Sequence, residues 1–304
     1  MIYTVTLNPA VDRELRVAEF AFDTVLRATA VRVDCGGKGF NVSRMLASLG
    51  ANSIALGFAA GKSGALLSEM LDSLGIETRF TWVAGETRTN VSIVTPQNGR
   101  YLKVNEPGPA ISADDQAVLL NQIRQLVQPG DWWVLAGSLP PGVPVGIYAE
   151  MTALIQAAGG RVILDTSGEA LAAGCGQRPF LIKPNETEAS SLSGRPIHTP
   201  EDALLAAKTI IASGPQNLVI SLGKAGAVFL NGSDAWLAAA PTIQERNPIG
   251  AGDSLVGGLV YALSQNLPPA EALGWGIACG AATASLAGTA VGDKTLVSRL
   301  LEQV

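Results

Sequence analysis

The chain has 304 residues, of which 47% are hydrophobic and 15% are charged, and its formal net charge is −5. This balance predicts a globular protein with a well-filled core and excludes intrinsic disorder. A negative net charge gives no general attraction to nucleic acid or to an anionic membrane, so we expect neither as a partner. A phosphorylated ligand would have to be held by a few local cations.

Cysteine and histidine usage exclude several kinds of site. Cys35, Cys175 and Cys279 are far apart and form no CxxC pair, so neither a disulfide framework nor a structural zinc site is predicted. His198 is the single histidine, which excludes a histidine-based triad and a multi-histidine metal site. We expect a cytoplasmic protein, because the first residues resemble a strand and not a secretory leader.

The first segments of the chain predict a strand and then a small, partly exposed sheet. Ile2–Leu7 has the composition of a strand that ends at Asn8–Pro9, with Asp12 just beyond it. Two short, partly alternating runs follow at Val11–Val17 and Ala28–Val33, a pattern that favours a two-sided, partly exposed sheet. We call this predicted sheet the flap.

A glycine-rich segment follows the flap. Cys35–Asn41 (CGGKGFN) leads into a helix-periodic stretch, Val42–Leu49, which Gly50 closes. Glycines permit close approach of the backbone to a ligand, and Lys38 and Asn41 supply a cation and an amide for phosphate or hydroxyl groups. A plain helix entry is the alternative interpretation.

A second hairpin would extend the flap. Thr87–Thr95 and Arg100–Val104 are strand-like and are separated by the turn residues Pro96–Gly99. Arg88 and Lys103 lie on or beside these strands, where each could hold a substrate phosphate or could simply be solvated.

From Ile111 onward, helices alternate with short apolar strands. The helical runs include Ala117–Val127, Ile147–Ala158 and Asp202–Ala212, and the strands include Trp132–Ala136, Val162–Asp165, Leu181–Lys183 and Leu218–Ser221. This alternation predicts right-handed βαβ crossovers and an α/β fold with a doubly wound, mostly parallel sheet flanked by helices. Residues 274–292 carry no charge, but they are too weakly apolar for a membrane span and predict a buried helix.

Polar residues collect where these strands end, which is the edge at which open α/β sheets bind ligands. They are Gly137-Ser138, Asp165, Lys183-Pro184-Asn185 and Ser221-Leu222-Gly223. Asn185 and Glu188 are three residues apart at a helix start, so Glu188 could help to position a hydrated magnesium ion. As a lone spacing, this is weak evidence.

The segment Asn247–Ser254 (NPIGAGDS) precedes an uncharged, helix-periodic run from Leu255 to Leu267. Its glycines allow consecutive N–H groups to converge at a helix start, where the helix dipole also favours an anion. Asp253 lies beside that point and could take a proton from an attacking hydroxyl. The hypothesis is a small-molecule kinase; the alternative is a plain turn in which Asp253 is an N-cap.

Two nucleotide motifs are excluded. Gly57–Ser63 (GFAAGKS) has three residues between its glycines where a P-loop needs four. The dinucleotide fingerprint fails because Leu255 stands where its third glycine should be.

Four segments, Gly36–Asn41, Gly137–Pro144 (GSLPPGVP), Lys183–Glu188 (KPNETE) and Gly250–Asp253, together resemble the ribokinase-like sugar kinases of the phosphofructokinase B branch. The opening TLNPAVD, the lysine in GGKG and the segment NEPGP at Asn105–Pro109 are most similar to fructose-1-phosphate kinases (1-phosphofructokinases) and tagatose-6-phosphate kinases. The minor 6-phosphofructokinases share SGEAL and SLPPGV but have glycine where Lys38 stands.

This resemblance implies roles for individual residues. Asp253 would be the catalytic base, with the amides of Gly250, Ala251 and Gly252 as the anion hole. Substrate contacts would come from Asp12, Gly37, Asn41 and Ser138, and neutralisation of the sugar phosphate from Lys38, Arg88, Arg27 and Lys103. The nucleotide side would comprise Lys183, Asn185, Ser221, Gly223 and Gly226. Glu188 would be the magnesium-linked acid, acting through water, with Asp165 as a further metal-side candidate.

The resemblance also implies an organisation and a reaction. A nucleotide-binding α/β domain would comprise residues 1–10, 34–86 and 107–304, and a β-sheet lid would comprise residues 11–33 and 87–106, through which a homodimer would form. The reaction would be ATP- and magnesium-dependent phosphorylation of a ketohexose monophosphate, with fructose 1-phosphate favoured. Tagatose-6-phosphate kinase, 6-phosphofructokinase and a non-catalytic nucleotide- or sugar-binding sensor remain as alternatives. A nicotinamide oxidoreductase is disfavoured by the missing fingerprint.

Overall fold

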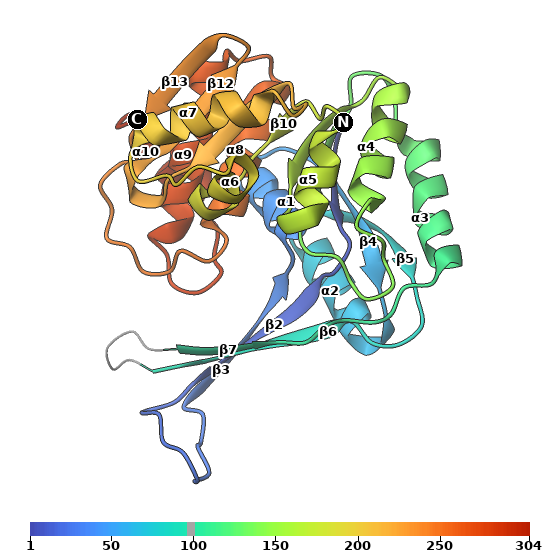
Figure 1. The fold of residues 1–304 in the computed structure, drawn as a ribbon. Helices are drawn as coiled ribbons and strands as arrows, with labels where there is room; N and C mark the ends of the chain where they lie inside the picture. Colours follow the sequence, from blue (N-terminus) through green and yellow to red (C-terminus); the bar gives the residue numbers. More distant parts are fainter. Residues whose placement is uncertain (96–100) are drawn as a thin grey trace.

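Two β-sheets organise the chain in the computed structural model, which describes residues 1–95 and 101–304 (Figure 1). A nine-stranded sheet forms the body of the molecule, and a four-stranded sheet projects from it. The predicted turn Pro96–Gly99 and the adjoining Arg100 lie outside the described residues.

The large sheet is mostly parallel, as predicted. Its strands are, in spatial order, β13 (Asp234–Ala238), β12 (Ala227–Asn231), β11 (Asn217–Ser221), β10 (Leu181–Ile182), β9 (Arg161–Asp165), β8 (Trp132–Ala136), β1 (Ile2–Thr6), β4 (Ile54–Ala59) and β5 (Glu77–Trp82). All neighbours from β11 to β5 pair in parallel, whereas β12 and β13 add an antiparallel hairpin at one edge.

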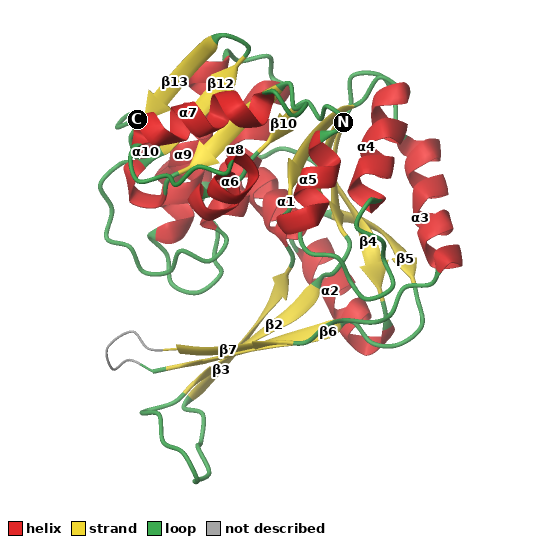
Figure 2. Cartoon of the chain, viewed as in Figure 1, coloured by secondary structure: helices red, strands yellow, loops and turns green. Residues whose placement is uncertain are grey.

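Helices cover both faces of this sheet, which confirms the predicted α/β class (Figure 2). One face packs against α3 (Ala113–Leu126), α4 (Ile147–Ala157), α5 (Gly168–Cys175), α6 (Glu186–Ser193) and α7 (Pro200–Ile211). On the other side lie α1 (Lys38–Ser48), α2 (Gly61–Ser73), α8 (Ala251–Ser264), α9 (Pro269–Ala284) and α10 (Lys294–Leu301). A short 3-10 turn, η1 (Gly223–Ala225), follows β11.

Three helical segments differ in detail from the sequence interpretation. α1 begins at Lys38, four residues before the predicted start, because Gly37 can take the N-cap position at φ 139°. α8 ends at Ser264 and not at Leu267, because the chain turns at Asn266 with φ 59°. Of the uncharged stretch 274–292, residues 274–284 form the buried part of α9, whereas residues 285–292 lie in the connection to α10 and not in the predicted helix. None of the helices searched within residues 1–95 and 101–304 is long and apolar enough to cross a membrane.

The small sheet has the strand order β3 (Ala30–Gly36), β2 (Ala10–Arg16), β6 (Arg88–Val94) and β7 (Tyr101–Asn105). β6 and β7 pair antiparallel, as predicted for the hairpin. β7 is exposed along its whole length, and Val31 of β3 is 53% exposed. The partly exposed sheet inferred from the alternating pattern is thus present.

The centre of the large core lies between β1 and β8. Trp133 is fully buried, and its ring stacks on that of Tyr3 with centroids 4.1 Å apart and an interplanar angle of 13°. A buried tryptophan contributes more apolar area than any other side chain, and stacking adds to it.

We therefore expect Trp133→Ala to lower the free energy of unfolding by about 3–5 kcal/mol, because it leaves a large cavity in a packed core. Urea denaturation followed by far-UV circular dichroism measures this. The matched control is Trp82→Ala, whose side chain is 54% exposed and should cost less than about 1 kcal/mol. Equal losses for the two variants would contradict this view of the core.

Candidate active site

The helices α1 and α8 approach closely, and their N-terminal turns meet above the carboxyl ends of β9 and β10. Glycine permits this approach: a Cβ atom on Gly257 of α8 would lie 2.8 Å from the Cβ of Met45 on α1. The contact brings Asn41 of α1 next to Asp253 of α8, although the two residues are 212 positions apart in the sequence.

The start of α8 has the geometry of an anion site. Gly250 is its N-cap and adopts a left-handed conformation with φ 80°, which glycine tolerates. The amide of Ala251 donates to the Pro248 carbonyl and that of Ser254 to the Gly250 carbonyl. Of the predicted anion hole, the Ala251 amide is therefore already used. The two intervening amides, those of Gly252 and Asp253, have no partner among the described residues, so the Gly252 amide is available to an anion together with the helix dipole.

Asp253 lies in the first turn of α8 and is 9% exposed. The alternative interpretation, in which Asp253 is a helix N-cap, is wrong, because Gly250 occupies that position and the helix has no side-chain cap. Asn41 instead donates its Nδ2 to Asp253 Oδ2 at 2.8 Å. Burial and the nearby charge of Asp165 raise the pKa of Asp253 to about 6, against the opposing effects of Lys38, Asn41 and Lys183.

A second buried acid, Asp165, lies at the end of β9 and is 1% exposed. Its Oδ1 accepts from Lys38 Nζ at 3.0 Å and lies 3.5 Å from Lys183 Nζ. Burial alone would raise the pKa of Asp165, but the two ammonium groups outweigh it and lower that pKa. Burial would likewise lower the pKa of Lys38, yet Asp165 and Asp253 raise it, so both ions stay charged.

Two residues predicted to contact opposite ends of the ligands therefore share one carboxylate. Lys38 was assigned to the sugar phosphate and Lys183 to the nucleotide side, and Asp165 holds both ammonium groups in the same place. A Cβ atom on Gly252 would lie 3.7 Å from Lys183 Nζ, so this ammonium borders the start of α8.

On the flap side, Asp12 of β2 faces the junction of the two sheets. It accepts from Asn90 Nδ2 at 2.8 Å, and burial raises the pKa of Asp12. The side chain of Asp12 occupies the space that a Cβ atom on Gly36 would need, which explains the glycine at the end of β3.

Arg88 lies at the start of β6 and is not simply solvated. Its three nitrogens donate to the backbone carbonyls of Pro9, Glu106 and Asn8 at 3.4, 3.1 and 2.9 Å. A guanidinium has five N–H groups, so two remain for a ligand.

The other predicted substrate residues lie at different distances from the site. Lys103 is exposed on β7, and its charge acts on Asp12. Ser138 follows Gly137, where a Cβ atom would lie 4.0 Å from Lys38 Cβ, and Gly37 caps α1. Arg27 is in the exposed connection between β2 and β3, which extends away from the body in Figure 1, so the structure does not bring it to the site within this chain.

A cavity of about 860 Å³ opens on the other side of the α8 N-terminus. Its lining includes the predicted nucleotide-side residues Asn185, Ser221, Gly223 and Gly226. Further lining residues were not identified from the sequence and come from the segment before Pro248 and from α9: Pro241, Thr242, Ile243, Ile277, Gly280, Ala281 and Ala284.

The spacing between Asn185 and Glu188 has a structural cause. Asn185 Oδ1 accepts from the Glu188 amide and Glu188 Oε2 accepts from the Asn185 amide, each at 2.9 Å, which makes a capping box at the start of α6. Within the part of the chain that the structure describes, no group of three His, Cys, Asp or Glu residues could hold a metal ion.

The rejected P-loop segment is closed to phosphate in the structure. The carboxylate of Glu86 accepts from the amides of Lys62 and Ser63 at 3.3 and 2.5 Å, so an acid already occupies the start of α2.

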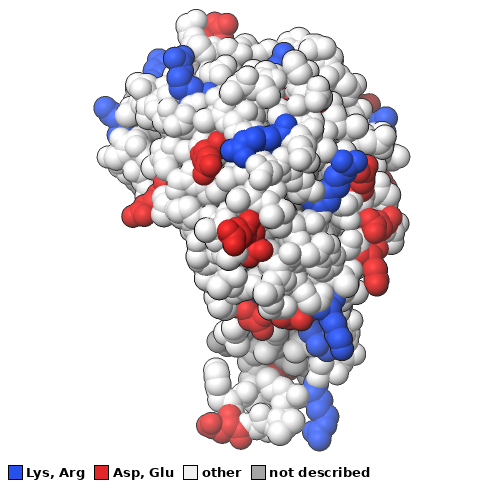
Figure 3. All heavy atoms as spheres, turned by 90° about the vertical axis from the view of Figure 1, so that its right-hand side faces the viewer, with Lys and Arg blue, Asp and Glu red and all other residues white. Residues whose placement is uncertain are grey.

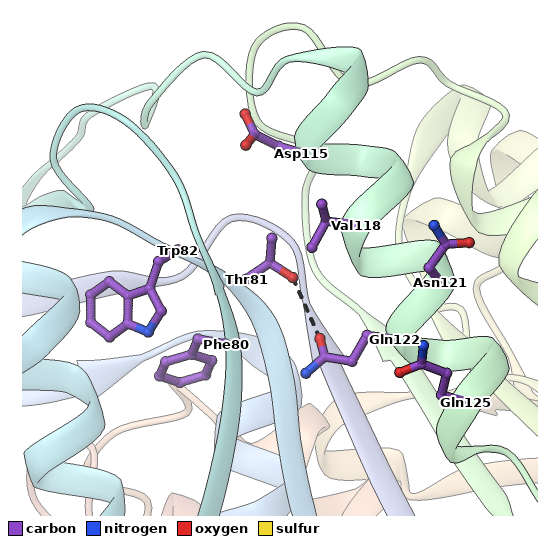
Figure 4. Close-up of a pocket in the computed structure, with 8 residues that line it drawn as sticks. All are labelled: Phe80, Thr81, Trp82, Asp115, Val118, Asn121, Gln122 and Gln125. Carbon is purple, nitrogen blue, oxygen red and sulfur yellow. Dashed lines mark hydrogen bonds between the residues drawn. The ribbon is translucent and has the colours of Figure 1, made fainter.

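A second cavity lies apart from the site. It is more open, has a volume of about 430 Å³ and lies between β5 and α3, where it is lined by Phe80, Trp82, Val118 and Gln122 among others (Figure 4). It includes none of the predicted site residues. On the face of the molecule shown in Figure 3, acidic and basic side chains are interspersed.

Sequence reasoning missed Asn90 and Arg44. Asn90 is two residues beyond Arg88, a spacing that places both on one side of β6, and this signal was available. Arg44 Nη1 donates to Asn41 Oδ1 at 3.1 Å. Its position three residues after Asn41 on α1 was an available but unspecific signal.

Known proteins resemble this chain over nearly its whole length. The model of the pfkB family of carbohydrate kinases matches residues 5–296. The 1-phosphofructokinase of Bacillus subtilis (strain 168) is 37% identical over 304 residues, covering 100% of this chain and 98% of that protein. The 1-phosphofructokinase of Rhodobacter capsulatus is 39% identical over 271 residues, covering 89% and 86%.

Solved structures show the same fold. Phosphofructokinase-2 from Escherichia coli, in complex with potassium, aligns with a TM-score of 0.94 at 31% identity over 99% of this chain and 98% of that chain. Ribokinase from Arabidopsis thaliana, complexed with ribose and ATP, aligns with a TM-score of 0.80 at 22% identity over 99% and 98%, a likeness of fold alone. The fold is ribokinase-like.

The two buried acids predict stability changes of opposite sign at neutral pH. Asp253→Asn should raise the free energy of unfolding by up to roughly 3 kcal/mol, because the raised pKa of Asp253 shows that the folded protein disfavours its ionised form. This gain should appear as pH rises from about 4 to about 6 and should be absent below that range. Asp165→Asn should instead cost about 3 kcal/mol, because it removes the carboxylate that both lysines share.

Urea denaturation of both variants between pH 2.5 and 8 tests this contrast. The Asp165→Asn deficit should persist from pH 8 down to about 4 and shrink only below that, because the lowered pKa of Asp165 keeps its stabilising charge until more acidic pH. Changes of equal sign at pH 7 would contradict the assignment of charge within this cluster.

Proposed function

The chain belongs to the pfkB family of carbohydrate kinases, and from this premise we propose that it transfers the γ-phosphoryl group of ATP to fructose 1-phosphate, giving fructose 1,6-bisphosphate and ADP. One observation carries the proposal: Asp253 lies beside the open Gly252 amide, between a cavity of about 860 Å³ and the Asp12 and Lys38 side of the site. Several full-length relatives are named 1-phosphofructokinase, which supports this acceptor.

In this mechanism Asp253 acts as the general base. A hydroxyl oxygen of the sugar forms a bond to the γ-phosphorus while the bond from that phosphorus to the bridging oxygen of ADP breaks, and the hydroxyl proton passes to Asp253. The Gly252 amide, at the positive end of the α8 dipole, would stabilise charge on the transferring group. A pKa of about 6 suits a base that must be ionised at neutral pH.

Substrate binding would use the cations and polar groups of both domains. Asp12, Asn41 and Ser138 would contact sugar hydroxyls, with the Gly37 backbone close by. Lys38, the two remaining N–H groups of Arg88, and Lys103 would neutralise the sugar phosphate. Arg27 would contribute only if a second copy of the chain or a movement of its loop brought it closer.

Nucleotide binding would use the large cavity, with Lys183, Asn185, Ser221, Gly223 and Gly226 on its phosphate and ribose sides. Mg²⁺ would need few protein carboxylates here, since phosphates and water complete the shell of this ion at nucleotide sites. Glu188 would reach it through water. When bound, Mg²⁺ neutralises charge on the phosphates. Two ammonium groups already share Asp165 Oδ1, so we assign Asp165 to lysine positioning and no longer to the metal.

The small sheet would act as a lid. We propose that residues 11–33 and 87–106 form it and that residues 1–10, 34–86 and 107–304 form the nucleotide-binding domain. Closure over the ligands would exclude water, which otherwise competes with the sugar hydroxyl. Exposed apolar side chains on this sheet, Val31, Leu102 and Val104, would support a homodimer through the lid.

The acceptor sugar is tested by ADP release with ATP and Mg²⁺. We expect the largest kcat/KM with fructose 1-phosphate, followed by tagatose 6-phosphate and fructose 6-phosphate, because Lys38 distinguishes the chain from the minor 6-phosphofructokinases. A different order would identify another sugar phosphate as the substrate, within the same family. Absence of ADP release with all three would favour a nucleotide- or sugar-binding sensor.

Asp253→Asn should lower kcat by a hundredfold or more, at roughly the upper range for loss of a general base, with a small change in KM. In the unsubstituted protein kcat should fall as pH drops below about 6, because protonated Asp253 cannot accept the hydroxyl proton. Steady-state rates between pH 5 and 8 measure both effects. Near-normal turnover by the Asn variant would refute this mechanism.

A further inference from the structure

Arg44 lies on α1, one helical turn after Asn41, and touches none of the groups proposed to react. Its Nη1 donates to Asn41 Oδ1 at 3.1 Å, and Asn41 Nδ2 donates in turn to Asp253 Oδ2 at 2.8 Å. These bonds connect Arg44 to the proposed base through a single amide.

The two bonds leave the amide of Asn41 only one orientation. A guanidinium can only donate hydrogen bonds and an ionised carboxylate can only accept them. With Arg44 on one side and Asp253 on the other, Oδ1 must face the guanidinium and Nδ2 must face the carboxylate. Without Arg44, the amide could turn over and present Oδ1 to Asp253, replacing an attraction by a repulsion between two oxygens.

Arg44 is itself anchored. Its Nη2 donates to the Thr289 carbonyl at 2.8 Å, in the loop between α9 and α10. The same loop accepts a hydrogen bond at Gly288 from Asn247 Nδ2, at 2.7 Å, so it also fixes the start of the NPIGAGDS segment. The loop between α9 and α10 thus holds both the Asn41 amide, through Arg44, and the segment that forms the anion site.

We propose that Arg44 is a positioning residue that holds Asn41 in the one orientation in which its amide directs Asp253 toward the attacking hydroxyl. This inference rests on the proposed kinase function, in which Asp253 is the base. Arg44 Nη1 contacts Asn41 Oδ1, and Asn41 Nδ2 contacts Asp253, so Arg44 would act on the base through Asn41.

A double-mutant cycle tests the proposal with ATP, Mg²⁺ and fructose 1-phosphate. Arg44→Met should lower kcat by roughly tenfold to a hundredfold, because a misplaced base loses its alignment. The KM for ATP should stay within about twofold, because Arg44 does not line the nucleotide cavity. In an Asn41→Ala background, the same substitution should change kcat by less than about twofold, since the amide that transmits its effect is gone.

The matched control is Ser48→Ala. Ser48 Oγ donates to the Gly292 carbonyl at 2.9 Å, so this variant also removes a bond between α1 and the same loop but does not touch Asn41. Its kcat should stay within about twofold of the unsubstituted value. Arg44→Lys, which keeps the charge but lacks the planar fork, provides a second variant should Arg44→Met fail to fold, and the same fall in kcat is expected.

Each outcome decides the inference. Equal effects of Arg44→Met in both backgrounds, or a comparable loss in Ser48→Ala, would show that Arg44 only anchors the loop and would overturn the positioning role. If the unsubstituted protein turned over none of the three sugar phosphates, the proposed function would be overturned, and this inference with it. If it turned over fructose 1-phosphate but the effects of the Arg44 and Asn41 substitutions on kcat were additive, only the inference would be overturned.

Discussion

The structure depends on charge compensation among three buried groups, Lys183, Asp165 and Asp253, and the partly exposed Lys38. Two carboxylates and two ammonium groups lie where α1, α8 and the ends of β9 and β10 converge. Each would be costly to bury alone, and together they are close to neutral. The two acids have unequal partners: Asp165 binds both lysine ammonium groups, whereas the side chain that donates a hydrogen bond to Asp253 is the neutral amide of Asn41. One acid is therefore kept ionised and the other is left with a raised pKa.

That inequality underlies the chemistry proposed for the site. A carboxylate that two cations neutralise is a poor base, whereas a desolvated carboxylate with a pKa of about 6 can accept a proton near neutral pH. The packing of α8, which is almost entirely buried beside α9, offsets the free-energy cost of burying Asp253. In the proposed mechanism, the surrounding core would thus help to make Asp253 an effective base.

The two sheets divide the remaining tasks. The parallel sheet fixes the positions of Asp165 and Lys183, because Asp165 ends β9 and Lys183 follows β10, and both strands are paired on both sides. The small sheet is more exposed and carries Asp12, Asn90 and Arg88 at its junction with the body. A well-packed large sheet and a more exposed small sheet would suit the proposed mechanism, in which the small sheet closes over the sugar.

The amino-acid sequence by itself determined the fold class, the four strands β8 to β11, the segments that meet at the site, and the family, because hydrophobic periodicity and glycine-rich motifs are local signals. It also indicated Asp253, although an N-cap was an equally open interpretation until Gly250 was seen in that position. It did not indicate the antiparallel edge hairpin of β12 and β13. Only the tertiary structure decided that Asp165 binds Lys38 and Lys183, that the Asn185–Glu188 spacing is a capping box, and that Arg44 reaches Asp253 through Asn41. Such pairings join residues up to 212 positions apart, and their strength depends on burial, which no local pattern specifies.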